Sequence, residues 1–347
     1  MSLADGTVGD RVEYAIAQHG SDKDGRVAAA AGTTSELADA TVATAATRAF
    51  VDELLDSYSD IELLEHITRS PRLASVLPYL QQPIRLLFPT LLAKRSGHDF
   101  DEEPLPDEVG ALQHARAAGV RVPAFRRLVP AGDDGIYYIV MERISGPTLA
   151  QAWWNLGLWG TVRAAWQLRK NLRLPLHAVT SQTTGGAHSG RTRCIWLYAL
   201  RGPARHASPA VFTSYLNWWL VNCRPTVLKP RYDLVLQPAK QHVLVHQDLA
   251  PRNMILDAQG DLWLVDCGHA GFYPSFMEYF GMEVRSPETP WLSERTWAAW
   301  WGHFRWSIRW IAAGSFYRYR KAWKAYAVIN LRTHRFRGEH VPFSDHL

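Results

Sequence analysis

The amino-acid sequence predicts an α+β protein with two lobes, a small β-rich lobe followed by a mostly helical one. Short apolar strands and one helix alternate from Ile84 to Glu142, with Gly and Pro residues at the turns. Beyond Thr148 the pattern is mostly helical, and it is interrupted once by a group of short strands between His242 and Asp266. This order of elements predicts three parts: a leader (1–49), an N-terminal lobe (50–143) and a C-terminal lobe (144–347).

The composition excludes several classes of protein. Hydrophobic residues make up 47% and charged residues 20% of the 347 residues, as in globular proteins, so wholesale disorder is excluded. No apolar run reaches the roughly 18–20 residues that cross a bilayer. The net charge of +5 is small for this length, and we expect no nucleic-acid partner.

The cysteines and the first residues indicate where the protein works. Cys194, Cys223 and Cys267 are far apart and form neither a disulfide framework nor a zinc pattern. The stretch MSLADGTVGD has no basic start followed by an apolar block, so we expect no secretory signal. Both observations predict a reducing, cytoplasmic location.

Turn and cap residues divide the N-terminal lobe into elements. Leu54, Leu55, Tyr58, Ile61 and Leu63 or Leu64 have helical spacing and predict one buried helix face. Ile84–Lys94 predicts two strands around a turn at Phe88-Pro89-Thr90. Pro106 and Asp107 open a helix that Gly119 ends. Pro123 confines the next strand to an edge or a bulge, and IYYIVME is a buried strand.

The C-terminal lobe begins after a break at Ser145-Gly146-Pro147, where Thr148 caps a helix. Two longer helices are predicted over Ala164–Leu176 and Pro209–Val221, with a polar loop near residues 180–190 between them. The segments VLVH, NMIL and LWLVD are short strands, and Gly260 makes a turn between the last two.

The chemistry lies in the segment HQDLAPRN, residues 246–253, and in Asp266-Cys267-Gly268. Asp248 and Asn253 are five residues apart, and Asp266 follows after a turn and an apolar strand. This spacing is that of the catalytic loop and the metal-binding Asp of protein-kinase-like phosphotransferases. The chain therefore resembles the aminoglycoside phosphotransferase and choline kinase group, most closely the fungal branch of the phosphotransferase enzyme family.

Two further segments carry the same resemblance. HAGFYPSFMEY, which follows Asp266, is similar to the family's A-G-x-Y-P-x-x-x-E-Y. Upstream, Lys94 ends a strand and Glu108 opens the next helix, as the family's phosphate-binding Lys and its Glu partner do. The matching features extend over about Ile84–Arg285, and they imply a bilobal protein-kinase-like fold.

The resemblance implies an ATP- and Mg²⁺-dependent transfer of phosphate to a hydroxyl of a small molecule. Lys94, held by Glu108, would bind the nucleotide phosphates, and the backbone of the hinge residues Glu142 and Ile144 would meet adenine. Asp248 would be the catalytic base, since a positioned carboxylate can take the hydroxyl proton. Asn253 and Asp266 would bind the metal through hard oxygen ligands.

The sequence also departs from the family pattern. No Gly lies between Gly32 and Gly97, so the phosphate-covering loop expected near Ser75–Gln82 lacks glycines. Gln247 replaces the Gly of H-G-D, and Cys267-Gly268 replaces Trp-Glu. These departures leave a second hypothesis open: a kinase-fold protein without phosphoryl transfer, either a binding protein or a biosynthetic enzyme that reuses the cleft.

The tail contains an amphipathic pattern at Trp297, Trp300, Trp301, Phe304, Ile308 and Ile311. Three interpretations stay open for it: core of the helical lobe, an aromatic wall of the acceptor site, or peripheral contact with a membrane, because Arg residues interleave with the Trp residues. Lys and Arg outnumber Asp and Glu from Cys267 onward. A basic region does not suit polycationic aminoglycosides, so we expect a neutral or anionic acceptor.

Overall fold

A computed structural model describes residues 51–73, 84–97, 106–132, 136–152, 155–173, 176–194, 197, 202–278 and 316–342. Three predicted features lie outside these ranges: the leader (1–49), the phosphate-covering loop (Ser75–Gln82) and the Trp-rich pattern (Trp297–Ile311). None of the helices described here combines the length and the apolar character needed to cross a bilayer.

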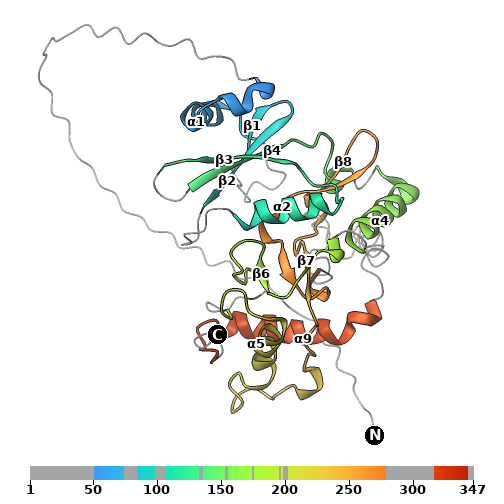
Figure 1. Ribbon diagram of the computed structural model, residues 1–347. Helices are drawn as coiled ribbons and strands as arrows, with labels where there is room; N and C mark the ends of the chain where they lie inside the picture. The colour runs from blue at the N-terminus through green and yellow to red at the C-terminus, as the bar shows by residue number, and fades with distance from the viewer. Residues whose placement is uncertain are drawn as a thin grey trace, which may run out of the picture. The chain divides into compact units, whose positions relative to one another are not determined.

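The N-terminal lobe is built on a four-stranded antiparallel sheet with strand order β1-β2-β4-β3 (Figure 1). Its strands are β1 (Ile84–Phe88), β2 (Leu91–Gly97), β3 (Phe125–Pro130) and β4 (Ile136–Glu142). Before the sheet come a 3₁₀ turn (Asp52–Ser57) and helix α1 (Asp60–Arg69), and helix α2 (Asp107–Ala117) lies between β2 and β3. The predicted strand pair, the helix opened by Pro106 and the edge position of β3 are confirmed.

Alternate residues of the central strand β4 face different helices, as the period of two in a strand requires. Tyr138 and Val140 pack in a cluster with Leu63 and Ile67 of α1. Tyr137 and Ile139 pack in another cluster with Val109 and other residues of α2. Figure 1 shows α1 and α2 on opposite sides of the sheet. The continuous apolar sequence of β4 is therefore explained by burial of both faces.

The prediction of one helix face through Leu54, Tyr58 and Ile61 is wrong. A second N-terminus intervenes at Ser59, whose hydroxyl and backbone form a reciprocal capping box with Glu62. The helix therefore starts again at Asp60 and turns Ile61 outward, with 74% of its surface exposed.

Residues just before the sheet extend it. Leu73 donates to the carbonyl of Ile84 (2.8 Å) and Leu86 donates to the carbonyl of Pro71 (2.9 Å), and Arg72 and Arg85 form an antiparallel bridge. The chain therefore enters and leaves residues 74–83 as two paired, antiparallel segments.

The described part of the C-terminal lobe is mostly helical. Its helices are α3 (Leu149–Ala152), α4 (Gly157–Arg173), α5 (Pro209–Val221) and α9 (Phe316–Arg335), with 3₁₀ turns at Leu176–Ala178, Tyr232–Leu234, Pro251–Asn253 and Cys267–His269. Thr148 caps α3 as predicted, by accepting from the backbone of Gln151 (3.2 Å). Helix α4 begins and ends earlier than the predicted Ala164–Leu176, whereas α5 has the predicted bounds. Together with the antiparallel N-terminal sheet, these helices confirm the predicted α+β fold of two lobes.

Short strands lie on both sides of residues 246–253, the predicted catalytic loop, which is also called the catalytic segment. One sheet has the order β5-β7-β10-β6, and a separate hairpin pairs β8 with β9. The strands are β5 (Thr180–Ser181), β6 (Gly185–Gly186), β7 (His242–Val245), β8 (Met254–Leu256), β9 (Leu262–Leu264) and β10 (Gly271–Tyr273). The stretch near 180–190, predicted as a polar loop, instead forms β5 and β6 and buries Thr184 and Ser189. It is polar because buried hydroxyls bond to neighbouring groups there, as Thr184 does to His242 (3.0 Å).

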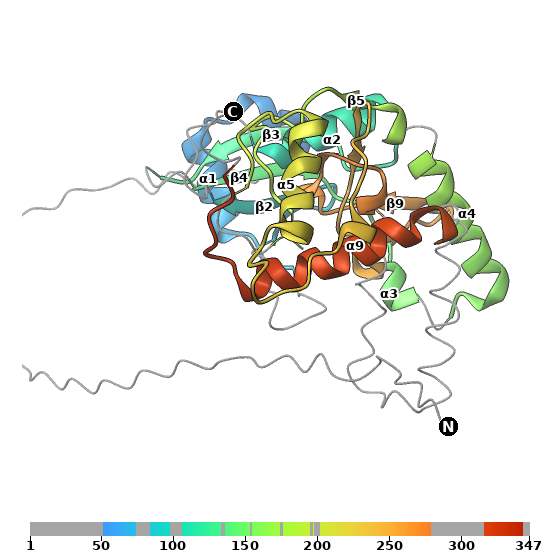
Figure 2. The same ribbon diagram turned by 90° about the horizontal axis from the view of Figure 1, so that it is seen from below.

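Two apolar clusters hold the C-terminal lobe. The first joins β4 and α2 of the N-terminal lobe to Leu249, Leu264 and other residues around the catalytic segment, so it spans both lobes. The second joins α5 to α9, which cross in Figure 2, and it includes the fully buried Trp219 and Tyr326. Apolar burial therefore fixes both the contact between the lobes and the support beneath the catalytic segment.

One buried cation ties α9 to the end of α5. Arg332 donates to the carbonyls of Trp219 (2.7 Å), Leu220 (2.7 Å) and Lys229 (2.8 Å), and only 8% of its surface is exposed. The last carbonyls of a helix have no partner within the helix, so this guanidinium caps the C-terminal end of α5.

We expect Arg332→Ala to lower the free energy of unfolding by about 3 kcal/mol, because three charge-assisted bonds are lost and buried carbonyls are left unpaired. Urea denaturation followed by circular dichroism would measure the change. Arg320→Ala, at an exposed position of the same helix, is the control and should change stability by less than about 0.5 kcal/mol. Equal effects of the two substitutions would contradict the capping role.

Candidate active site

Lys94 lies at the point where the two lobes meet. It belongs to β2, pairs with Ile139 of β4, and exposes 8% of its surface. Its ammonium Nζ lies 2.8 and 2.9 Å from the two carboxylate oxygens of Glu108 on α2 and 2.6 Å from Oδ1 of Asp266 in the C-terminal lobe. One cation therefore links the sheet, the helix α2 and the segment after β9.

Lys94 and Asp266 stabilise each other's charge, whereas burial raises the pKa of Glu108 above its usual value although Lys94 acts in the opposite direction. Burial by itself lowers the pKa of Lys94, but the nearby carboxylates of Glu108 and Asp266 outweigh burial and raise it above its usual value. Burial likewise raises the pKa of Asp266, yet the charge and hydrogen bond of Lys94 dominate and lower it to about 2. Lys94 and Asp266 are thus both charged at neutral pH, as a phosphate-binding cation and a metal-binding carboxylate need to be.

Asp266 is held in an unusual backbone conformation. Its φ of 64° and ψ of 62° lie in the left-handed region, which costs a non-Gly residue on the order of 1–2 kcal/mol. Gly268 follows, and a Cβ added there would lie 3.5 Å from a Glu108 oxygen and 3.6 Å from Lys94 Nζ. The turn therefore aims the Asp266 carboxylate at Lys94, and the small residue at 268 leaves room around the cluster.

Asp248 and Asn253 lie on the same loop and are bonded to each other. Asn253 donates from Nδ2 to the backbone carbonyl of Asp248 (2.8 Å) and to its Oδ2 (3.0 Å). Arg252 donates to both carboxylate oxygens of Asp248, at 3.1 and 3.0 Å. These bonds fix the Asp248 carboxylate in place and direct the amide hydrogens of Asn253 toward it, so Oδ1 is the amide atom that the predicted metal-binding role would use.

The loop is also bonded to the segment that carries Asp266. Val265 donates to the carbonyl of Asn253 (3.0 Å), at the open end of the β8–β9 hairpin. His246 contacts the carbonyl of Val265 through Nε2 (3.0 Å) and accepts from the backbone of Asp248 through Nδ1 (3.3 Å). Burial lowers the pKa of His246, so it is neutral at pH 7 with its proton on Nε2. His246 therefore holds the loop together and does not act as an acid or base.

Gln247 occupies the position where the family has Gly. Its φ is 64°, so this position needs the left-handed conformation that Gly adopts without strain. The side chain is fully buried and donates to the carbonyls of His269 (2.7 Å) and Arg193 (3.3 Å). These bonds offset the strain and join the catalytic loop to two neighbouring segments.

Glu278 anchors the beginning of the catalytic loop. Its carboxylate accepts from the backbone amides of His246 (2.7 Å) and Gln247 (3.1 Å), and only 2% of the residue is exposed. Burial raises its pKa to about 7, although the two amide donors act in the opposite direction. The sequence motif FYPSFMEY contains this Glu, but the sequence alone assigned it no role.

Asp107, next to Glu108, binds the buried polar stretch of the C-terminal lobe. It accepts from the backbone of His188 (2.9 Å) and of Ser189 (2.8 Å) and from the Ser189 hydroxyl (2.7 Å). The sequence interpretation treated Asp107 only as a helix opener. The structure shows that it fixes the start of α2, and with it Glu108, against the C-terminal lobe.

The two hinge residues lie at the end of β4. The backbone N–H of Glu142 donates to the carbonyl of Ala124 (2.9 Å), and that of Arg143 donates to the carbonyl of Thr90 (2.8 Å). The carboxylate of Glu142 accepts from the backbone of Ala124 (3.0 Å) and lies 3.5 Å from Arg116. The backbone N–H groups of Glu142 and Arg143 are thus both bonded within the lobe. Of the two predicted hinge residues, Ile144 is therefore better placed than Glu142 to donate a hydrogen bond to adenine.

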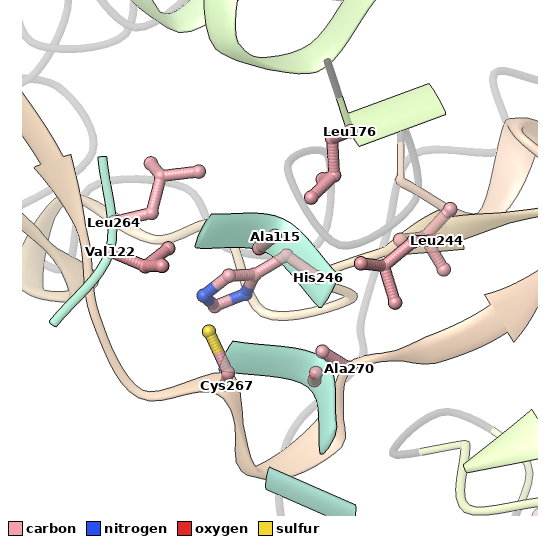
Figure 3. A pocket seen from close by; sticks show the side chains of 10 residues that line it. Ala115, Val122, Leu176, Leu244, His246, Leu264, Cys267 and Ala270 are labelled. Carbon is pink, nitrogen blue, oxygen red and sulfur yellow. The ribbon is translucent and has the colours of Figure 1, made fainter. Parts of the chain in front are cut away.

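A small apolar cavity of about 10 Å³ lies beneath the catalytic loop (Figure 3). Figure 3 shows His246 and Cys267 facing it among aliphatic side chains such as Leu264 and Leu176. Its volume is at the lower limit for one water molecule, and its lining offers too few polar partners to hold one. It is therefore a packing defect of the core and not a substrate site.

The residues present fit magnesium better than a metal that needs a protein cage. Among the described residues, no group of three or more His, Cys, Asp or Glu side chains converges as a metal cage would. Asp266 and Asn253 instead supply one carboxylate and one amide oxygen from adjacent ends of the β8–β9 hairpin. Mg²⁺ is usually held in this way, by one or two protein oxygens together with phosphates of the substrate and water.

The structure thus brings the sequence-predicted residues into two linked groups. Lys94, Glu108 and Asp266 form the first, and Asp248 and Asn253 form the second. Arg252, Glu278 and Asp107 complete these groups and were not among the predicted site residues. A signal for Glu278 exists in the sequence, since an acid in an otherwise apolar segment indicates a buried, bonded carboxylate.

The raised pKa of Glu278 predicts a specific pH dependence. The pKa of Glu278 rises from 4.5 in the unfolded chain to about 7 in the folded one. Between pH 4.5 and 7 the folded state therefore keeps a proton on this carboxyl that the unfolded state has lost, and the free energy of unfolding falls as pH rises through this range. We expect the free energy of unfolding of the wild type, relative to Glu278→Gln, to decrease by up to about 1.4 kcal/mol per pH unit and to level off above pH 7. Urea denaturation from pH 5 to 8.5 would measure it.

The matched control for this experiment is Glu65→Gln, at an exposed position of α1. Its stability relative to the wild type should change little over the same pH range, because its surface ion pair contributes little. A pH-independent difference for Glu278→Gln would show that the buried carboxyl does not titrate near pH 7.

Comparison with known protein families gives a match for this chain. The model of the Phosphotransferase enzyme family matches residues 90–307. The search of curated proteins gave no match.

Solved structures with some similarity include three aminoglycoside phosphotransferases. APH(4)-Ia is 15% identical over 72% of this chain and 87% of its own, with a TM-score of 0.38. The aminoglycoside-3'-phosphotransferase of type VIII is 17% identical over 71% and 85%, with a TM-score of 0.38. The aminoglycoside 2'-phosphotransferase-IIIa in complex with GDP is 10% identical over 77% and 83%, with a TM-score of 0.42.

With such TM-scores the structural matches carry no argument, and the assignment depends on the family match. That match covers more than half of the chain, from the turn before β2 through both groups of site residues. The chain therefore belongs to the phosphotransferase enzyme family.

Proposed function

We propose that the protein is an ATP- and Mg²⁺-dependent phosphotransferase that phosphorylates a hydroxyl group of a small molecule. The observation that supports this most directly is the position of Lys94. It bridges Glu108 of the N-terminal lobe and Asp266 of the C-terminal lobe, in a chain whose family transfers phosphate. Burying such charges is costly even when they are paired, and clusters of this kind with shifted pKa values are found preferentially at functional sites.

In this proposal Lys94 binds the nucleotide phosphates and Glu108 keeps its ammonium in place. Glu108 can do so because α2 is itself fixed by Asp107 to the C-terminal lobe. Adenine would meet the hinge backbone near Glu142 and Ile144, within reach of the same cleft. A cytoplasmic location, where ATP is abundant, completes the proposal.

Asp266 and Asn253 would hold Mg²⁺, which when bound neutralises charge on the transferring phosphate. Before nucleotide arrives, Lys94 already contacts the Asp266 carboxylate at 2.6 Å. Binding of the phosphates would therefore draw Lys94 toward the nucleotide and release Asp266 for the metal. The lowered pKa of Asp266 keeps this carboxylate ionised and ready to bind a cation.

Asp248 would orient the acceptor hydroxyl and take its proton. Asn253 and Arg252 hold its carboxylate in one orientation, so little reorganisation is needed when the acceptor binds. The acceptor itself would be a neutral or anionic metabolite and not a polycationic aminoglycoside, because the C-terminal region is basic and Arg252 lies beside the catalytic carboxylate.

The roles of the two carboxylates can be separated experimentally. We expect Asp248→Asn to reduce kcat about 10²- to 10⁴-fold while nucleotide affinity stays within about twofold, because the base is lost and the phosphate site is kept. Asp266→Asn should instead weaken the magnesium-dependent binding of nucleotide at least about tenfold. ADP release over a panel of hydroxyl metabolites and calorimetric titration with ATP analogues would measure these effects.

Asp233→Asn is the control for both carboxylates, because Asp233 forms an exposed ion pair with Arg231 on a distant 3₁₀ turn. It should leave kcat and nucleotide affinity unchanged. If Asp266→Asn bound Mg·ATP as well as the wild type did, the proposed metal site would be wrong.

A second candidate function is nucleotide or metabolite binding without phosphoryl transfer. The specific observation behind it is Gln247, which places a fully buried side chain where the family has Gly, directly before Asp248. If this side chain blocks transfer, Gln247→Gly should create ADP release that the wild type lacks. If the wild type already transfers phosphate, the variant should only lose the two bonds of Gln247 and become less stable.

A further inference from the structure

Helix α4 carries an apolar face that nothing in the described chain covers. The exposed fractions are 51% for Leu158, 83% for Trp159, 37% for Val162 and 63% for Trp166. These residues recur at steps of three and four, so they lie on one side of the helix. Large exposed aromatic residues grouped in this way mark interaction sites more often than chance exposure.

The same helix has a separate buried face, so folding does not need the exposed one. Ala164, Leu168 and Leu172 are at least 96% buried and pack in the cluster that supports the catalytic segment. Gln167 and Asn171 bond to the β8–β9 hairpin. Removing the exposed side chains should therefore leave the fold and the site intact.

The charge on α4 has one sign. The helix contains Arg163, Arg169, Lys170 and Arg173 and no Asp or Glu. Arg169, Lys170 and Arg173 occupy the last two turns of the helix, directly after the exposed apolar residues. Arg163 lies 3.8 Å from Asp261 of the neighbouring hairpin and donates to the carbonyl of Gln259 (3.0 Å), so the basic end of the helix, with Lys170 and Arg173, carries the charge considered below. The same Asp261 pairs with Arg121 (2.8 Å), and Asp257 accepts from the indole of Trp263 (2.8 Å).

We propose that α4 docks on an anionic membrane surface, with Trp159 and Trp166 in the interfacial region and the basic end against lipid phosphates. Interfacial helices combine Trp and Leu on one face with Lys and Arg beside it, and each cation near an anionic surface adds about 1 kcal/mol. The charge pattern requires an anionic partner, and a convex helix face suits a flat surface better than a binding groove would.

The position of α4 allows this contact. In Figures 1 and 2 the helix lies at the edge of the described part of the chain. None of its residues belongs to the cluster of Lys94 and Asp266 or to the loop of Asp248. Docking and phosphoryl transfer can therefore be tested separately on the full-length protein.

The test is flotation of the purified full-length protein with vesicles of phosphatidylcholine alone or with about 30% phosphatidylserine, which gives the vesicle surface a negative potential. We expect binding to the anionic vesicles that falls as salt is raised, and at least about tenfold weaker binding to the neutral ones. Trp159→Ser/Trp166→Ser should reduce binding to anionic vesicles at least about tenfold. Lys170→Glu/Arg173→Glu should do the same.

Two double variants are matched controls. Val227→Ser/Tyr232→Ser removes apolar side chains that are 66% and 69% exposed elsewhere. Lys240→Glu/Arg337→Glu reverses two exposed charges away from α4. Both should bind anionic vesicles as the wild type does, and all four variants should keep the wild-type circular dichroism spectrum.

Three results would overturn the proposal. They are absence of binding to the anionic vesicles, binding that is equal for neutral and anionic vesicles, and binding by the α4 variants that equals that of the controls. In the first case, the cationic apolar face would instead point to an acidic protein partner.

Discussion

The bridge from Lys94 to Glu108 and Asp266 is the interaction on which the arrangement of the two lobes around the site depends. It joins a strand, a helix and the turn after a hairpin through one buried ammonium. An unpaired charge at this depth would be expensive, so each partner constrains the other two. The left-handed backbone at Asp266 is part of this arrangement, since it directs the carboxylate to the cation.

A second set of contacts fixes the catalytic loop from behind. Glu278 holds the amides of His246 and Gln247, neutral His246 joins the loop to Val265, and Gln247 reaches the neighbouring carbonyls. Each satisfies backbone groups that burial would otherwise leave unpaired. The Asp248 carboxylate is thus positioned by buried hydrogen bonds and by the apolar cluster beneath the loop.

The proposed activity and the proposed membrane contact use different parts of the C-terminal lobe. The inner face of α4 supports the β8–β9 hairpin, and through it Asn253 and Asp266, while its outer face presents Trp and basic side chains. One helix can serve both purposes because its faces are separate.

The sequence alone determined what depends on local chemistry. Cap and turn residues predicted α2, α5 and the β1–β2 pair. The grouping of Asp248, Asn253, Asp266, Lys94 and Glu108 was implied by the resemblance to phosphotransferases, which these residues carry in their order and spacing. The tertiary structure decided what depends on contacts distant in sequence. Ile61 is exposed because a capping box restarts the helix, and the polar stretch near Thr184 is buried because distant partners satisfy its hydroxyls. Glu278 acquires its role only when folding brings it against amides 31 and 32 residues away, a distance that no local pattern encodes.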